Sequence, residues 1–283
     1  MKSILKNRRL LWLLIAGLII GLLWGGAKYL PQAIDWSTAF RPAVWRLLGG
    51  EQIYDVAVEG HYYLNAPWAL IPLIPLALLP EELGRAALFV VSILAFMYTA
   101  HKLGAKAYSN ALLILSPPVV HGLLNGNIDW LATLGFVLPP QIGLFFISTK
   151  PQIGIAVGIY WLIDLWRSKG LRETIRVFAP FTLVFTASLL IWGLWPLNFA
   201  TQLNLWWNAS FWPYSIPLGV MLLGMAIVKK RNELAMLASP LLSPYILFHS
   251  WVGAMFSIIR SIPAMLIVFI GLWSVVIYRL LLL

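Results

Sequence analysis

The sequence predicts an all-α protein, a polytopic membrane bundle of about eight to ten transmembrane helices that forms one domain over residues 1–283. Hydrophobic residues make up 61% of the chain and charged residues only 11%, whereas soluble domains carry about 25% charged residues. Apolar runs recur along the whole chain, and basic residues gather in clusters between them. Such a chain cannot cover itself with polar side chains, so lipid must be a large part of its solvent.

The first apolar run, Leu10–Ala27, follows several basic residues and has no small-residue cleavage pattern, so it predicts a retained signal-anchor helix. Several later runs are shorter than the ~20 residues of a straight span, and many contain proline or glycine, such as Pro72 and Pro118. Interrupted helices are tolerated where protein or a water-filled cavity satisfies the backbone, which predicts an internal groove. These later runs lie at 66–80, 85–100, 119–138, 150–166, 177–195, 214–228, 233–248 and 262–282.

The basic residues predict the orientation, because cytoplasmic loops carry the excess of Lys and Arg. Eleven of the 20 basic residues lie in three clusters, Lys2/Lys6/Arg8/Arg9, Arg167/Lys169/Arg172/Arg176 and Lys229/Lys230/Arg231. We therefore expect a multi-pass protein of the cell membrane with a cytoplasmic N-terminus, external loops at 28–65 and 196–213, and no nucleic-acid partner despite the net charge of +10. An even number of spans must separate the first two clusters, so 107–118 or 139–149 must also cross.

The first external loop contains an apolar stripe at helical spacing, formed by Trp36, Phe40, Ala43, Val44 and Leu47. Gly49-Gly50 ends this helix, and Pro42 marks a kink or a late start. An amphipathic helix next to a span predicts a location along the membrane surface.

Asp35 immediately precedes that stripe and has two interpretations. A helix N-cap is a common role for aspartate. Alternatively, a carboxylate held beside a cavity at the membrane surface acts as a base that takes a proton from an acceptor hydroxyl. Arg41 is a candidate phosphate ligand, and a lipid-headgroup contact explains it equally well.

Polar residues inside the apolar runs are costly in a membrane and therefore mark candidate sites. Asn125, Asn127 and Asp129 lie together, where they either bond between helices or contact sugar hydroxyls; Asp129 alternatively pairs with a buried Lys or Arg. Lys150 either snorkels at a helix end or clamps a phosphate, with Gln152 assisting at a hydroxyl.

His249 lies near a membrane boundary, where it is either an interfacial hydrogen-bonding residue or part of the site. The loop 196–213 is rich in tryptophan, which predicts an aromatic belt at the outer interface or a platform that stacks on sugars. The other three histidines show no metal-ligand spacing and the chain has no cysteine, so no bound metal or cofactor is predicted, although a divalent metal is not excluded.

Several short motifs, in order along the chain, resemble glycosyltransferases of the GT-C superfamily, most closely family 87, the polyprenyl-phosphate-mannose-dependent group. The motifs are Asp35–Ala43, Leu48–Asp55, Tyr62–Trp68, Ser116-Pro117-Pro118, Asn125–Asp129, Thr149–Gln152 and Ser243–His249. The chain departs from the family pattern in its short length, in Asn127 where glutamine is expected, and in Ser250 where an aspartate commonly follows the late histidine.

The resemblance implies a GT-C-like fold and an enzyme that moves a hexose, mannose above all, from a polyprenyl-phosphate donor to a lipid or glycan hydroxyl on the external face with inversion. It implies Asp35 as the general base. It also implies substrate contacts from Arg41, Tyr63, Asn125, Asn127, Lys150, Gln152 and His249. Two alternatives stay open, a transporter or flippase of lipid-linked sugars and a catalytically inactive short member of the family.

Overall fold

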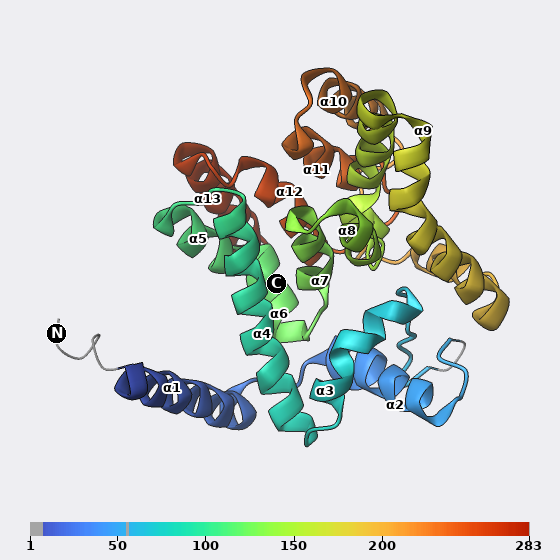
Figure 1. Cartoon of the computed structure of the whole chain (residues 1–283). Helices are drawn as coiled ribbons and strands as arrows, with labels where there is room; N and C mark the ends of the chain where they lie inside the picture. The colour runs from blue at the N-terminus through green and yellow to red at the C-terminus, as the bar shows by residue number, and fades with distance from the viewer. Residues whose placement is uncertain (1–7, 55–56, 283) are drawn as a thin grey trace.

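The computed structural model describes residues 8–54 and 57–282, without the side chains of 8–16, 199 and 202. Within these residues every regular element is helical, and the only strand-like pairing is an isolated bridge between Val58 and His61. Figure 1 shows the helices in chain order. The predicted all-α class is confirmed for this part of the chain. Lys2 and Lys6 of the first basic cluster lie outside the described residues.

The elements include α-helices, 3-10 helices and one π-helix, and many are short. In order they are α1 (Arg8–Tyr29), η2 (Asp35–Phe40), α2 (Arg41–Gly49), η3 (Pro67–Leu73), α3 (Ile74–Ala77), α4 (Glu81–Lys102), α5 (Ala107–Ile114), α6 (Pro117–Asn125), α7 (Asp129–Leu134), η4 (Gly135–Val137), α8 (Pro140–Ile147), α9 (Pro151–Trp192), η5 (Trp195–Gln202), α10 (Ile216–Lys229), α11 (Asn232–Leu241), η6 (Phe248–Trp251), α12 (Val252–Met255), η7 (Phe256–Ile258) and α13 (Ile262–Leu281).

Three helices of the described residues, α4, α9 and α13, are long and apolar enough to cross a membrane. The bent pair α5 and α6 makes a fourth if it counts as one span, with an angle of 55° between its halves. This pair contains the element 107–118, one of the two that the charge pattern suggested as an extra crossing. The helix α1 covers the predicted run Leu10–Ala27 but, with part of its side chains undescribed, lies outside this count.

The described helices thus give fewer spans than the eight to ten that the apolar runs predict. Prolines and glycines explain much of the difference, because they end helices inside the runs. The run 66–80 forms η3 and α3, which together cover 67–77 and contain Pro72. The run 119–138 breaks after Asn125, where Gly126 adopts φ +68°. In α9, two helical stretches meet at Gly170, which adopts φ +80° inside the second basic cluster.

The helix of the first external loop differs from its predicted position. It begins with a π-helical turn at Asp35–Phe40 and continues as α2 to Gly49, where Gly50 adopts φ +71° and caps it. Pro42 explains the π-turn, because proline has no N–H to donate to the carbonyl four residues earlier and its ring clashes there. The apolar stripe is buried in the protein, with Trp36 and Val44 fully covered. The stripe therefore does not form a membrane-binding face.

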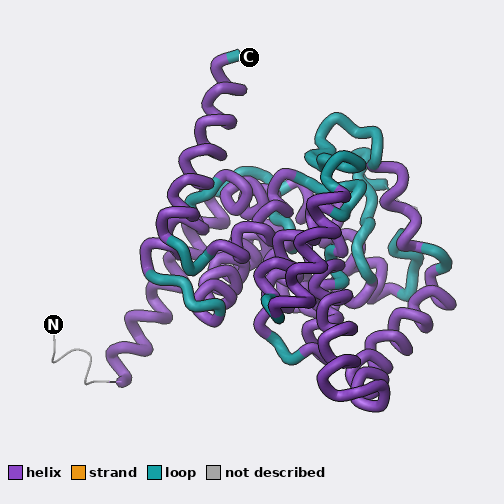
Figure 2. Tube along the Cα trace, turned by 90° about the horizontal axis from the view of Figure 1, so that it is seen from above, coloured by secondary structure: helices purple, strands orange, loops and turns teal. Residues whose placement is uncertain are grey.

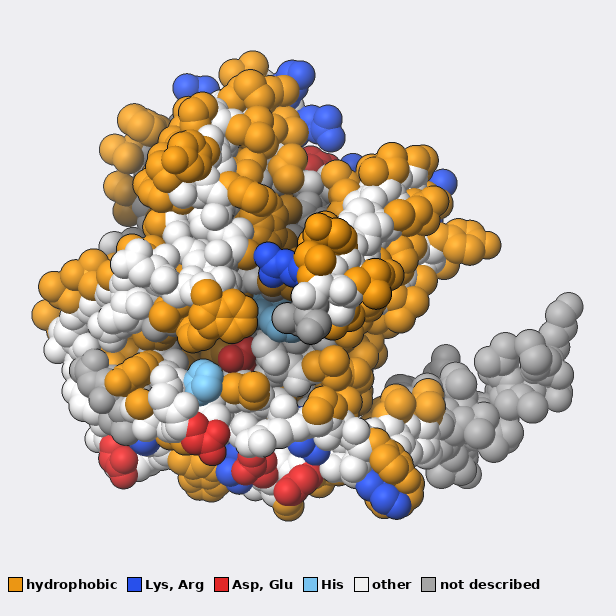
Figure 3. Space-filling view, turned by 180° about the vertical axis from the view of Figure 1, so that it is seen from behind, with side chains coloured by type: hydrophobic (Ala, Val, Ile, Leu, Met, Phe, Trp, Pro, Cys, Tyr) orange, Lys and Arg blue, Asp and Glu red, His pale blue; other side chains and the backbone are white. Residues whose placement is uncertain are grey.

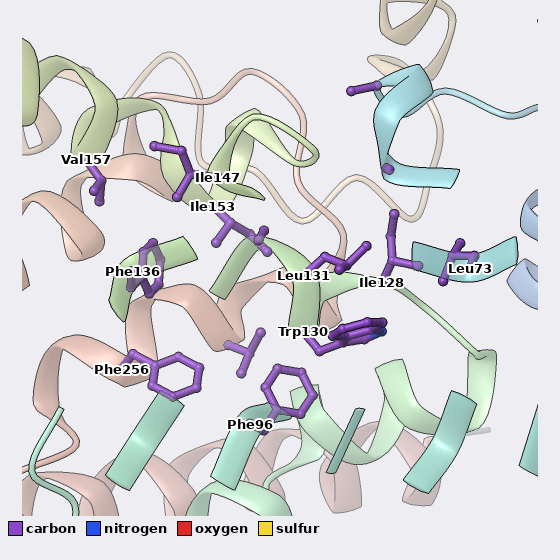
Figure 4. Packing of buried hydrophobic residues seen from close by; sticks show 14 of the residues in the cluster. Leu73, Phe96, Ile128, Trp130, Leu131, Phe136, Ile147, Ile153, Val157 and Phe256 are labelled. Atoms are coloured by element: carbon purple, nitrogen blue, oxygen red, sulfur yellow. The ribbon is translucent and has the colours of Figure 1, made fainter. Parts of the chain in front are cut away.

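The core connects these interrupted helices. Figure 4 shows Ile128, Trp130 and Leu131 at its centre, between Phe96 of α4 and the side chains of the α8 and α9 region. Its aromatic rings pack edge to face, as Phe136 does on Phe256 with ring centroids 6.2 Å apart. Aromatic packing of this kind adds about 0.5–1.5 kcal/mol per pair to the burial of apolar area.

At the periphery, α1 crosses α4 at a close approach (Figure 1). A Cβ on Gly26 would lie 2.9 Å from the Cβ of Ala86, so only glycine permits this contact. Arg85 fixes the crossing by donating to the carbonyls of Ala27 and Pro31. The C-terminal helix α13 projects from the bundle (Figure 2), with only 6% of its most apolar window buried. Such an exposed apolar helix is suited to lipid contact.

Candidate functional site

The candidate site forms where four helix interruptions meet. Asp35 begins the π-helical turn, Asn127 lies in the break between α6 and α7, Lys150 lies between α8 and α9, and His249 lies in the short helix η6. Pro151 holds Lys150 in an extended conformation at φ −138°, because the residue before proline is excluded from the helical region. The interrupted helices therefore bring polar side chains together inside an apolar protein.

Asp35 is the member of this site that reaches the surface. Its side chain is half-buried, and its Oδ2 accepts a hydrogen bond of 2.6 Å from Nδ2 of Asn127. The N-cap interpretation is wrong, because Asp35 is the first residue of the helix and the N-cap position belongs to Ile34, where no side-chain capping bond is made. Among the described residues Asp35 makes no ion pair, so its carboxylate stays available to a ligand. Figure 3 shows an acidic side chain in a hollow between hydrophobic ones, with histidines nearby.

Gly126 allows Asn127 to reach Asp35. A Cβ at position 126 would lie 2.7 Å from the Cβ of Trp36 and 2.9 Å from the Cβ of Ala33. Both distances are too short for carbon atoms, so the backbone of the α6 end can touch the start of the π-turn only where position 126 is glycine. Its φ of +68° is also a conformation that side chains other than glycine's disfavour.

Behind Asp35 lies a buried ionic network centred on Asp129. Nζ of Lys150 lies 2.7 Å from Oδ1 of Asp129, and the two side chains are each only 3% exposed. The Oδ1 atom also accepts a bond of 2.9 Å from Ser250, and Oδ2 accepts a short one from Nδ1 of His249. Asp129 thus pairs with a buried lysine, one of the alternatives that its position allowed. Buried charges require this degree of compensation.

Asn127 joins the ionic network to Asp35. Its Oδ1 accepts from the backbone N–H of Ile128 at 2.7 Å and, at a short distance, from Nζ of Lys150. Its Nδ2 lies 2.6 Å from Oδ2 of Asp35 and 3.2 Å from Nε2 of His249. The amide is 6% exposed. Every polar atom of Asn127 is therefore engaged within the protein.

An apolar pocket borders the network, lined by Pro118, Val119 and Leu123 on one side and by the polar atoms of the network on the other. Outside it, the exposed ring of His121 stacks on His249, with centroids 5.6 Å apart and an interplanar angle of 28°. Gly122 permits this arrangement, because a Cβ there would lie 3.2 Å from the Cβ of His249. The carboxylate that lines this pocket is that of Asp129, whose oxygens are bonded within the network.

The rest of the loop 28–65 is hydrogen-bonded to the segment that carries Lys150. Tyr54 donates to the carbonyl of Asn65 at 2.7 Å, and the amide of Asn65 donates to the carbonyl of Thr149, next to Lys150. Tyr63 donates to the carbonyl of Ala66. Burial raises the pKa of Tyr54 and of Tyr63 well above the ordinary tyrosine value, so both hydroxyls stay neutral donors. The hydroxyl of Tyr63 is thus used in folding the loop.

The other predicted substrate contacts lie in different surroundings. Arg41 is partly exposed and lies 3.5 Å from Glu81, at the start of α4. Asn125 and Gln152 are half-buried, and neither makes a side-chain hydrogen bond with another described residue. These two amides are therefore available to a ligand, unlike Asn127, Lys150 and His249, whose polar atoms contact one another.

The loop 196–213, predicted to be external, is hydrogen-bonded to the segment that carries His249. Asn208 donates to the carbonyls of Leu203 and Pro244 and accepts from the N–H groups of Ser210 and Ile246, at 3.0–3.1 Å. Beside it, Trp206 and Trp207 remain exposed. This geometry fixes the loop and leaves both predicted roles of its tryptophans, belt and sugar platform, open to experiment.

Three further residues contribute to the geometry of the site, although the sequence did not predict that role for them. Ser250 seemed a departure from a family pattern, yet it donates to Asp129. His121 was considered only as a metal ligand, and Gly126 only as part of a motif. The signal for Gly126 was its place directly after the apolar stretch 119–124 and Asn125, where a glycine is a typical end of a helix. Nothing in the sequence placed His121 against His249.

Within the described residues, no group of three or more His, Cys, Asp or Glu side chains is arranged to hold a metal ion. In comparisons with known proteins, the chain matches no family model, no curated protein and no solved structure.

Proposed function

We propose that this protein is a membrane glycosyltransferase that moves a hexose from a polyprenyl-phosphate donor to a hydroxyl acceptor at the external face. The proposal combines the resemblance to GT-C family 87 with the position of Asp35. The observation that supports it best is a half-exposed carboxylate held by Asn127 in front of a buried, charge-compensated network. By the resemblance, the hexose is mannose and the acceptor is a lipid or a glycan.

In the proposed reaction Asp35 is the general base. Asn127 occupies Oδ2 of the carboxylate, so Oδ1 accepts the hydrogen bond of the incoming acceptor hydroxyl. The hydroxyl proton moves to Asp35 as the acceptor oxygen attacks the anomeric carbon from the side opposite the phosphate. The bond between that carbon and the phosphate oxygen breaks, and the electron pair leaves with the polyprenyl phosphate. The anomeric configuration inverts, and Asp35 later releases its proton to water.

The donor phosphate needs a positive or hydrogen-bonding partner, which we assign to Arg41. Its side chain is 25% exposed and its pairing with Glu81 is loose at 3.5 Å, so a phosphate can displace the carboxylate. The half-buried amides of Asn125 and Gln152 are the proposed contacts to sugar hydroxyls. Lys150 has no direct role, because its ammonium group is buried against Asp129.

The test uses the full-length chain in lipid vesicles with a radiolabelled polyprenyl-phosphate-mannose donor. Transfer predicts label in a new lipid or glycan product, and the anomeric proton coupling of that product reports inversion. A transporter would instead move intact donor across the vesicle membrane without consuming it. Movement of intact donor with no new product would overturn the proposal, as would a product of retained configuration.

A further inference from the structure

We propose that Asn127 is a positioning residue that holds His249 as the neutral tautomer protonated at Nδ1, and so leaves Asp35 as the one proton acceptor of the site. The inference deepens the proposed function, and it rests on that function only for its catalytic consequence. The proton positions themselves follow from the donors and acceptors around one amide.

The first step fixes the orientation of the Asn127 amide. One end of the amide faces the backbone N–H of Ile128 at 2.7 Å and the ammonium group of Lys150. Both neighbours can only donate, since neither carries a lone pair for a hydrogen bond. The atom between them must therefore be the carbonyl oxygen, and the NH₂ group must occupy the other end.

The second step fixes the tautomer of His249. The NH₂ group has two hydrogens, and its two neighbours are Oδ2 of Asp35 at 2.6 Å and Nε2 of His249 at 3.2 Å. The ionised carboxylate accepts one hydrogen, so Nε2 must present its lone pair to the other. The ring proton then lies on Nδ1, which faces Oδ2 of Asp129. Asp129 accepts from Lys150, Ser250 and His249, which is consistent with an ionised carboxylate.

The third step concerns protonation of His249. A proton on Nε2 would point at the NH₂ hydrogens of Asn127, and the amide could relieve this clash only by flipping. A flip would turn the NH₂ group toward Lys150 and the Ile128 N–H, where two donors already point. Besides Asn127, the groups that face His249 are Asp129, Ser250 and the ring of His121. Asn127 thus presents a donor, and no acceptor, to Nε2 of His249.

The consequence for the site is a division of roles. Asp129 and Lys150 compensate each other, His249 stays neutral, and Asp35 is the titratable group with both a surface path and a free oxygen. Asn127 thereby separates the base from a histidine only one amide away. Without it, Asp35 and His249 would compete for the same proton.

The test is ¹⁵N NMR of the full-length chain in micelles, with the label on histidine only. The chain has four histidines, so single His→Gln substitutions at positions 61, 101 and 121 assign the His249 signals. We expect one protonated nitrogen, Nδ1, and one unprotonated nitrogen, Nε2, throughout pH 6–8, a window chosen around the ordinary histidine pKa of ~6.5. A His249 that carries its proton on Nε2, or on both nitrogens at neutral pH, would overturn the inference.

Two variants extend the test. Asn127→Asp places carboxylate lone pairs against Nε2, so His249 should gain a second proton and both nitrogens should appear protonated at neutral pH. Lys150→Gln should do the same, because Asp129 then takes its compensating charge from His249. The matched control is Asn125→Asp, which makes the same change at an amide two residues away with no side-chain bond, and it should leave the His249 spectrum unchanged. An unchanged spectrum in folded Asn127→Asp and Lys150→Gln would contradict the assignment.

The catalytic arm is a pH–rate profile of mannose transfer. Asn127→Asp should move its acid limb to higher pH, because a second carboxylate beside Asp35 opposes ionisation. Asn204→Asp makes the same change at an exposed amide outside the proposed substrate contacts and should leave the limb in place. An unmoved limb in active Asn127→Asp would contradict the catalytic consequence. If the wild type transfers no sugar, the proposed function fails, and the His249 spectrum still decides the proton positions.

Discussion

Lys150 and Asp129 form an ion pair of 2.7 Å that is almost fully withdrawn from solvent. This ion pair changes the role that each residue is expected to have. A lysine in an apolar run is a natural candidate for a phosphate ligand, yet here its charge balances that of a neighbouring carboxylate. The network that results also orients Asn127, which in turn holds Asp35.

The ion pair predicts a specific pattern of stability. Lys150→Met should destabilise the protein by about 3–5 kcal/mol, because it leaves the buried charge of Asp129 uncompensated. The double variant Asp129→Asn with Lys150→Met should lose less than the sum of the two single variants. Reversible unfolding in mixed micelles measures all three, with the exposed Lys229→Met as control. Additive losses would show that the two charges do not depend on each other.

The close approach at Gly126 predicts that a larger residue there destabilises the protein and disturbs the site. Gly126→Ala should cost about 1–3 kcal/mol, because alanine must adopt a left-handed conformation and its Cβ would collide with Trp36 at 2.7 Å. The shift should also separate Asn127 from Asp35. The control is Gly224→Ala in α10, where nothing lies within 4 Å of the added carbon. Equal melting temperatures for the two variants would mean that the close approach does not constrain the fold.

The hydrogen bonds of Asn208 predict that this residue keeps the loop 196–213 rigid. Asn208→Ala removes two hydrogen bonds within this loop, to Leu203 and Ser210, and two between the loop and the segment before His249, to Pro244 and Ile246. Limited proteolysis should then cut within 196–213 faster than in the wild type, by roughly 5- to 30-fold for a loss of about 1–2 kcal/mol. Asn204→Ala, an exposed neighbour, is the control. Cleavage at the wild-type rate in Asn208→Ala would show that other contacts hold the loop.

The buried tyrosines predict a loss of stability at high pH. Burial raises the pKa of Tyr54 and Tyr63, and it raises that of Tyr245 to about 12. The unfolded chain releases these protons near pH ~10, so it binds fewer protons than the folded chain above that value. Stability is therefore fully present below pH ~10 and falls as pH rises, by about 1.4 kcal/mol per pH unit for each group.

Tyr54→Phe isolates one of these groups, since phenylalanine keeps the ring that stacks on Trp195 but cannot ionise. Unfolding measured between pH 10 and 12 should show a shallower pH slope for this variant than for the wild type. The same slope in both would mean that Tyr54 ionises as readily in the folded protein as in the unfolded chain.

The sequence predicted the composition of the site better than its contacts. Asn127 and Lys150 were selected because polar residues in apolar runs are costly, Asp35 because it precedes the apolar stripe, and His249 as a histidine near a membrane boundary. The structure brings all four together. Their mutual hydrogen bonds could not be predicted, because they depend on how four separate helix interruptions are placed in space. Periodicity identified the buried stripe of the first external loop, but it cannot tell a face covered by protein from a face covered by lipid.

The number of spans shows the same limit. Hydropathy counts apolar residues, whereas a span also needs an unbroken helix. Pro72 lies inside a 3-10 helix that leads into the short helix α3, and Gly126 ends α6 inside an apolar run. The positions of these residues in the sequence predicted that the helices would be interrupted. The bend between successive helices depends on tertiary packing, which cannot be predicted from a single sequence.

The most direct test of the proposed mechanism is the rate of mannose transfer by Asp35→Asn. The amide keeps the shape of the side chain but cannot take a proton, so we expect transfer to fall by about 10²- to 10⁴-fold while the melting temperature stays close to that of the wild type. Glu51→Gln, an exposed acid in the same external loop, should transfer at the wild-type rate. Transfer by Asp35→Asn at the wild-type rate would contradict the assignment of Asp35 as the base.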